Sequence, residues 1–122
     1  MLDYILLLGG ALMMAFWGVA HIFPTRNVVK GFGDISRDNK YIITMEWVVE
    51  GLSFIFIAVL VASMTLFNGP DEKGSYIVSV SGIMVFVVWT LLTGARVKML
   101  PFKLCPVILT IAAVVIFFGA II

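Results

Sequence analysis

Two glutamates four residues apart, Glu46 and Glu50, lie at the start of a segment that otherwise has the composition of a membrane-spanning helix. In an α-helix this spacing places both carboxylates on one face, one turn apart. A carboxylate that faces lipid costs about 2.5 kcal/mol or more at the centre of a bilayer. We therefore expect polar side chains from other segments to face this pair.

The chemistry available to such a pair is acid–base chemistry or polar binding. Like charges one turn apart disfavour simultaneous ionisation, so one glutamate could hold a proton near neutral pH, where the single histidine, His21, also titrates. This arrangement suits a proton relay, general acid–base work, or a cationic or hydroxylated ligand. No metal is expected, since no histidine follows a glutamate by three or four residues. No cofactor motif is present either.

The composition identifies an integral membrane protein. The 122 residues are 62% hydrophobic and 12% charged, whereas a soluble domain is roughly 45–50% apolar and ~25% charged. The length allows about four spans of ~20 residues and leaves no room for a second domain. The net charge of +1, without a basic stripe, predicts no nucleic-acid partner. The single cysteine, Cys105, excludes an intrachain disulfide.

Hydrophobic runs separated by turn signals predict an all-α fold. We expect one domain, residues 1–122, forming a bundle of four transmembrane helices with spans at about 4–23, 42–67, 76–94 and 105–122. Pro24 ends the first span, and Pro101 is expected to stop the third helix. Consecutive helices are expected to pack as antiparallel neighbours.

The connection at residues 25–41 predicts a short interfacial segment with its apolar side toward the headgroups. Gly31 and Gly33 are expected to break or bend any helix there. Ser36 or Asp38 is the expected N-cap of the following helix, because either side chain can accept hydrogen bonds from free backbone amides.

Basic residues predict the orientation of the chain. The connections at 25–41 and 95–104 hold seven of the eight Lys and Arg residues, whereas the turn at 68–75 holds one. The positive-inside rule then places the first and third connections in the cytoplasm and both termini outside. The predicted location is the plasma (inner) membrane of a prokaryote.

This orientation brings other polar residues to the same membrane face as the glutamates. His21 ends the first span and Arg96 follows the third, so both could converge on Glu46 and Glu50. The remaining expected site residues are aromatic or hydroxylated side chains near the same level: Trp17, Trp47, Trp89, Ser53 and Thr93.

A purely structural interpretation stays open beside the functional one. The two glutamates, the histidine and the arginine could neutralise one another and hold three helices together. The tryptophans could belong to an interfacial aromatic belt, and the hydroxyls could join neighbouring helices.

One segment suggests a known family. The string Gly18-Val19-Ala20-His21-Ile22-Phe23-Pro24, which closes the first span and leads into a basic connection, resembles the start of DoxX-like small four-helix membrane proteins. Length and hydropathy are similar across the whole chain. The resemblance implies a four-helix bundle and little about activity. The strings at 31–36 and 46–51 look more like the signature of a separate family.

Three functional hypotheses follow. The leading one is a bundle that binds a lipophilic or amphipathic small molecule in a cytoplasm-facing polar pocket, with Glu46 and Glu50 at its polar end. The second is a proton-coupled transporter or channel subunit, which would require a homo-oligomer because four short helices enclose little volume. The third, and less favoured, is an intramembrane enzyme on a lipid-like substrate, with Glu50 as base and His21 or Glu46 as acid. Membrane lipid is the expected partner.

Overall fold

The computed structural model describes the backbone of residues 1–122 and every side chain except that of Ala95. The elements are α1 (Leu2–Ile22), α2 (Thr25–Lys30), α3 (Arg37–Phe67), α4 (Lys73–Thr93), the 3-10 helix η1 (Gly94–Arg96) and α5 (Leu100–Ile121). The described backbone contains no strand. Within it, α1, α3, α4 and α5 are long and apolar enough to cross a membrane. The predicted all-α bundle is therefore confirmed, with four helices that are long and apolar enough to span a membrane.

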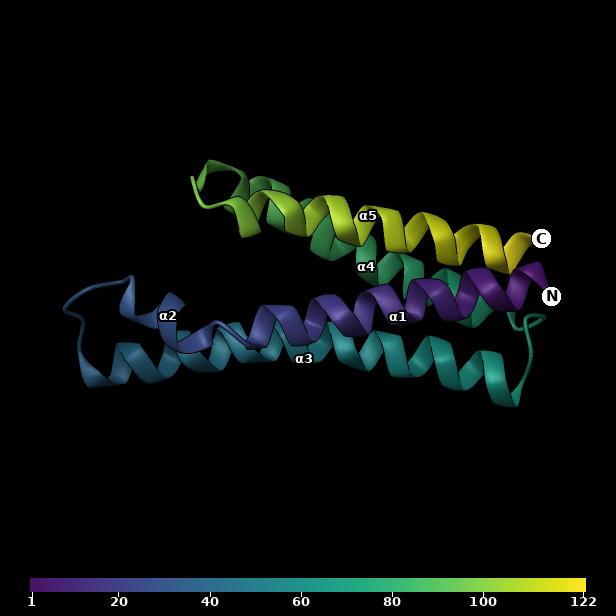
Figure 1. Cartoon of the computed structure of the whole chain (residues 1–122), viewed down its shortest axis with the longest axis horizontal. Helices are drawn as coiled ribbons and strands as arrows, with labels where there is room; N and C mark the ends of the chain where they lie inside the picture. Colours follow the sequence, from purple (N-terminus) through teal and green to yellow (C-terminus); the bar gives the residue numbers. More distant parts are fainter.

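The four long helices lie side by side, and the two termini lie at the same end of the bundle (Figure 1). We call the opposite end the basic end, because it carries Arg26, Lys30, Arg37, Lys40, Arg96, Lys98 and Lys103. α1 packs along both α3 and α5, and α4 packs along α5. α3 and α4 touch much less, although they follow one another in the chain. The expected packing of consecutive helices is thus wrong for this pair.

Glycines explain why α1 packs so closely on its two neighbours. A Cβ on Gly18 would lie 2.7 Å from the carbonyl oxygen of Gly51 in α3. On the other side of α1, a Cβ on Gly119 of α5 would lie 2.9 Å from Cγ of Leu7. Helices in lipid associate through such close backbone packing, because lipid tails are as apolar as the side chains. No comparable contact joins α3 to α4 at any described glycine.

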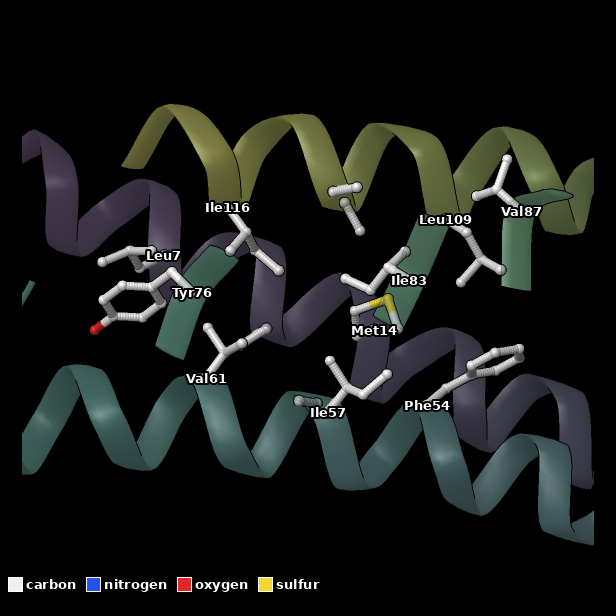
Figure 2. Packing of buried hydrophobic residues seen from close by; sticks show 14 of the residues in the cluster. Leu7, Met14, Phe54, Ile57, Val61, Tyr76, Ile83, Val87, Leu109 and Ile116 are labelled. Atoms are coloured by element: carbon white, nitrogen blue, oxygen red, sulfur yellow. The ribbon is translucent and has the colours of Figure 1, made fainter. Parts of the chain in front are cut away.

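Buried side chains from all four long helices form the core (Figure 2). The largest fully buried ones include Phe54 and Tyr76. The Tyr76 hydroxyl lies 3.0 Å from the Thr65 hydroxyl and donates to the carbonyl oxygen of Gly69 at 3.1 Å. These bonds join α3 to α4 beside their connecting turn. Toward the basic end, the Phe54 ring of α3 packs edge-on against the Phe86 ring of α4, with ring centroids 5.1 Å apart.

The first connection follows the sequence prediction closely. α2 ends at Lys30, and Gly33 adopts a left-handed backbone with φ of 73°, so the predicted break at the glycines is confirmed. The Ser36 side chain accepts a hydrogen bond from the Asn39 amide at 3.1 Å. Of the two expected N-caps of α3, Ser36 is therefore the one used.

The last connection differs from the prediction. Pro101 does not stop the third helix, because α4 already ends at Thr93 and η1 follows. Instead, Pro101 lies in the first turn of α5, where its missing N–H would have no intrahelical partner anyway. The last helix consequently begins at Leu100, before the expected start near residue 105. This earlier start places Phe102 on α5, facing the site described next.

Candidate functional site

A cavity of about 440 Å³ lies inside the bundle near the basic end. Its volume is within the 300–1,000 Å³ that is typical of small-molecule sites. We call it the central cavity. It is lined by residues of all four long helices, including Trp17 and His21 of α1, Trp47 and Glu50 of α3, Trp89, Thr90 and Thr93 of α4, and Phe102 and Cys105 of α5.

The polar centre of the cavity wall is the pair His21 and Glu50. Nε2 of His21 lies 3.4 Å from Oε2 of Glu50, and 7% of the histidine side chain is exposed against 30% of the glutamate. This nitrogen is buried and has no hydrogen-bond partner among the residues that the structure describes. A buried polar group without a partner costs about 1–3 kcal/mol. The pair is therefore incompletely satisfied by the protein itself.

Trp47 holds the imidazole in place. Its indole stacks on the His21 ring, with centroids 4.0 Å apart and planes inclined by 15°. The indole Nε1 also donates to the backbone carbonyl oxygen of His21 at 2.7 Å. The last carbonyls of a helix have no intrahelical N–H to accept from, and at the end of α1 side chains supply the missing donors. The neighbouring carbonyl of Ile22 accepts from the Thr25 hydroxyl in the same way.

The two glutamates occupy different places, although they share one face of α3. Glu50 lines the central cavity, whereas Glu46 is exposed and lines a groove on the outside of the bundle. One helical turn separates them by about 6 Å along the axis. Only the deeper glutamate therefore reaches the imidazole.

The other predicted site residues fall into two groups. Trp17, Trp47, Trp89 and Thr93 line the central cavity, and Ser53 lines the outer groove. The hydroxyls of Ser53 and Thr93 donate to carbonyl oxygens of their own helices, Val49 at 2.8 Å and Trp89 at 2.7 Å. These two hydroxyls thus do not join neighbouring helices.

Arg96 is not brought to the cavity. It belongs to η1, beyond the end of α4, and its side chain is exposed. Among the ion pairs of the described residues, it forms none with Glu46 or Glu50. The 3-10 turn carries the chain beyond the cavity wall. Arg96 therefore lies outside the central cavity, apart from the His21–Glu50 pair.

Phe102 and Cys105 are among the lining residues that the sequence reasoning does not include in the site. The Phe102 ring lies 5.5 Å from the Trp47 ring, and Sγ of Cys105 accepts a hydrogen bond from Nε1 of Trp17 at 3.3 Å. The signal that reveals them is the preference of proline for the first turn of a helix. Starting the last helix at Pro101 places both residues on it, roughly one turn apart.

The chemistry of the cavity is that of one carboxylate and one imidazole in an aromatic surrounding. Its remaining lining is mostly apolar, and no Lys or Arg belongs to it in the described part of the chain. The described residues contain no group of three or more His, Cys, Asp or Glu able to hold a metal ion. The arrangement can orient a polar group by hydrogen bonds or exchange a proton with it.

Comparisons with known proteins add no relative. No family model matches the chain, and neither the curated proteins nor the solved structures contain a match to it. The resemblance to DoxX-like proteins stays a prediction. The functional argument is therefore built on the geometry of the central cavity.

Proposed function

We propose that this membrane protein binds a lipophilic small molecule with a polar end in the central cavity. The observation that carries the proposal is the buried Nε2 of His21, which lacks a partner and lies beside Glu50 in an aromatic cavity. Ligand sites are mostly apolar, with a few placed polar groups that set the orientation. His21 and Glu50 act as these groups.

The three tryptophans contact the apolar body of the ligand. Trp17, Trp47 and Trp89 all line the cavity, and each offers a large flat surface. The ligand's polar end hydrogen-bonds to the His21–Glu50 pair, which offsets the cost of the unpartnered nitrogen. Glu46, on the outer groove, has no direct part in this contact.

The orientation of the site is part of the proposal. The positive-inside rule puts the basic end in the cytoplasm, so the cavity lies on the cytoplasmic side and both termini outside, in the plasma membrane of a prokaryote. A thiol reagent that cannot cross the membrane should label Asp71→Cys on intact cells and Asp34→Cys only after lysis. Both positions are exposed. The reverse labelling would contradict this orientation.

The binding proposal is testable by intrinsic fluorescence, because the chain contains three tryptophans and all of them line the cavity. Panels of lipids, quinones and sterols are titrated into the purified protein while fluorescence and melting temperature are recorded. At least one class should change both signals in the wild type and much less in Glu50→Gln. Glu46→Gln, a matched change outside the cavity, should behave like the wild type. If no class affects the wild type selectively, the proposal fails.

A second candidate function is an enzyme that moves a proton on a lipid-like substrate. The 3.4 Å separation of His21 Nε2 and Glu50 Oε2 favours it. The cycle starts from a Glu50 carboxylate and a His21 imidazolium: Glu50 takes a proton from one carbon of the substrate, and His21 returns its own proton to another. The proton on Glu50 then passes to His21, which restores the pair without a co-reactant, and exchange of these protons with solvent carries label into the product. In heavy water this function predicts deuterium in the recovered lipid, and none with Glu50→Gln. A wild type that binds lipid without exchange would exclude it.

A further inference from the structure

A groove on the outside of the bundle follows the boundary between α3 and α4. It consists of two adjoining hollows of about 520 and 450 Å³, which share Val49, Ser53 and Phe86. We call this the lateral groove. It meets the central cavity at Trp47, Glu50, Trp89 and Phe102, which line both. These four residues thus form the boundary that a molecule would cross between the side of the bundle and the His21–Glu50 pair.

The lateral groove exists because α3 and α4 pack weakly toward the basic end. Its rim faces outward along the membrane-spanning length, where 67% of Phe56 and 64% of Trp89 are exposed. In a membrane this surface meets acyl chains and not water. A molecule dissolved in the bilayer can thus reach the cavity without leaving the membrane.

The two parts of the lateral groove differ in polarity. Phe56, Ile57 and Phe86 make the hollow farther from the basic end apolar, whereas the hollow beside the central cavity also carries the carboxylate of Glu46. As far as the described side chains go, no Lys or Arg lines either space. A phosphate or carboxylate head group would therefore face Glu50 with no cation to balance it.

The pair itself matches a hydroxyl group. A hydroxyl donates one hydrogen bond and accepts others, so it can donate to the Glu50 carboxylate and accept from the N–H of His21. We assign the proton of the neutral imidazole to Nε2, which faces the Glu50 carboxylate. An ammonium head has donors only and could not accept from this N–H, whereas an uncharged alcohol can satisfy both residues.

We propose that the ligand is a single-chain lipid with a hydroxyl head group, which passes sideways from the membrane between α3 and α4. Its hydroxyl bridges His21 and Glu50, and its chain lies in the lateral groove over Ser53 and Phe86. This inference rests on the proposed binding function and gives its ligand class and route.

The head group is tested with the full chain in lipid nanodiscs. Hexadecanol, hexadecanoic acid and hexadecylamine, each with a terminal bromine, are compared as saturable quenchers of tryptophan fluorescence. The alcohol should bind about 5- to 150-fold more tightly than the other two, because an unmatched polar end costs about 1–3 kcal/mol. Equal or tighter binding of the acid or the amine would overturn the hydroxyl assignment and leave the binding function standing. Saturable quenching by none of the three would overturn the single-chain ligand, whereas the binding function fails only if the lipid, quinone and sterol panels also show no selective effect.

The route is tested by stopped-flow association of the brominated alcohol. Ser53→Phe fills the lateral groove and should slow association several-fold, whereas Phe86→Ala widens it and should speed association. Val59→Phe is the matched control: Val59 lies on α3, is 58% exposed and lines none of the hollows described. Circular dichroism checks that each variant keeps its helical content. Equal association rates in Ser53→Phe, Phe86→Ala and wild type would overturn the route even where binding persists.

Discussion

Replacing Gly18 by alanine is expected to push α1 away from α3. A Cβ there would lie 2.7 Å from the carbonyl oxygen of Gly51 and 2.7 Å from Cγ1 of Ile55. The oxygen belongs to the backbone of α3, so a rotamer change cannot relieve that contact and the helices must separate. Overpacking of this kind costs about 1–3 kcal/mol.

Gly9→Ala is a matched control in the same helix. A Cβ at Gly9 would meet no described atom within 4 Å beyond its own helical surroundings. Both substitutions gain the same intrinsic helix propensity, about 1 kcal/mol on scales from soluble helices. The propensity gain cancels in the comparison, so Gly18→Ala should be less stable than Gly9→Ala by about 1–3 kcal/mol.

The assay is unfolding in mixed micelles, with far-UV circular dichroism recorded as the denaturing detergent increases. Gly18 lies one helical turn before His21, so the same displacement should widen the gap to Glu50 and weaken ligand binding. Equal free energies of unfolding for Gly18→Ala and Gly9→Ala would refute the close contact between α1 and α3.

Other substitutions test the remaining parts of the argument. Trp47→Phe keeps an aromatic ring over His21 but removes the 2.7 Å hydrogen bond to its carbonyl, so unfolding in micelles should show a loss of about 1–3 kcal/mol; unchanged stability would mean that the bond contributes nothing. Ser36→Ala removes the N-cap of α3 and should cost about 1 kcal/mol in the same assay, whereas Ser36→Asp should cost little. If binding is the function, liposomes containing the protein should hold a pH gradient as long as empty ones. A leak that Glu46→Gln abolishes would favour the proton-coupled transporter instead.

The sequence predicts the number and type of helices well, for a clear physical reason. In a membrane every backbone polar group must be satisfied within the helix, so long apolar runs leave one structure available. The helix ends are also readable where a local signal exists, as at Ser36 and Gly31. Pro101 is misread because the same residue can follow one helix or begin the next.

The arrangement of the helices is harder to predict. Side chains on a lipid-facing helix are apolar all round, so hydrophobic periodicity does not show which face meets which neighbour. The contacts that decide the arrangement are close approaches at Gly18, Gly51 and Gly119, and each depends on two helices at once. The weak packing of α3 on α4, and the lateral groove with it, follows from those pairings.

Only part of the candidate site can be predicted from the sequence, because the arrangement of the helices decides which side chains meet. His21 and Glu50 converge as expected, because both lie near the same end of adjacent helices. Arg96 does not join them, since its position depends on the 3-10 turn after α4. Glu46 and Glu50 share one helix face, and the packing of α1 on α3 shows that only Glu50 lies beside the imidazole.

The contacts in the bundle indicate whether the His21–Glu50 pair serves to hold the helices together or to bind a ligand. A pair kept only to hold helices together would gain most where both groups are fully hydrogen-bonded, since a buried ion pair otherwise costs more than it contributes. Here Nε2 of His21 has no hydrogen-bond partner in the part of the chain that the structure describes, and Glu50 is partly exposed to a cavity. The glycine contacts of α1 and the Tyr76–Thr65 bond hold the bundle elsewhere. The His21–Glu50 pair thus borders a cavity, and its own hydrogen bonding is incomplete although α1 and α3 already pack closely beside it, which is the arrangement expected of groups that bind a ligand.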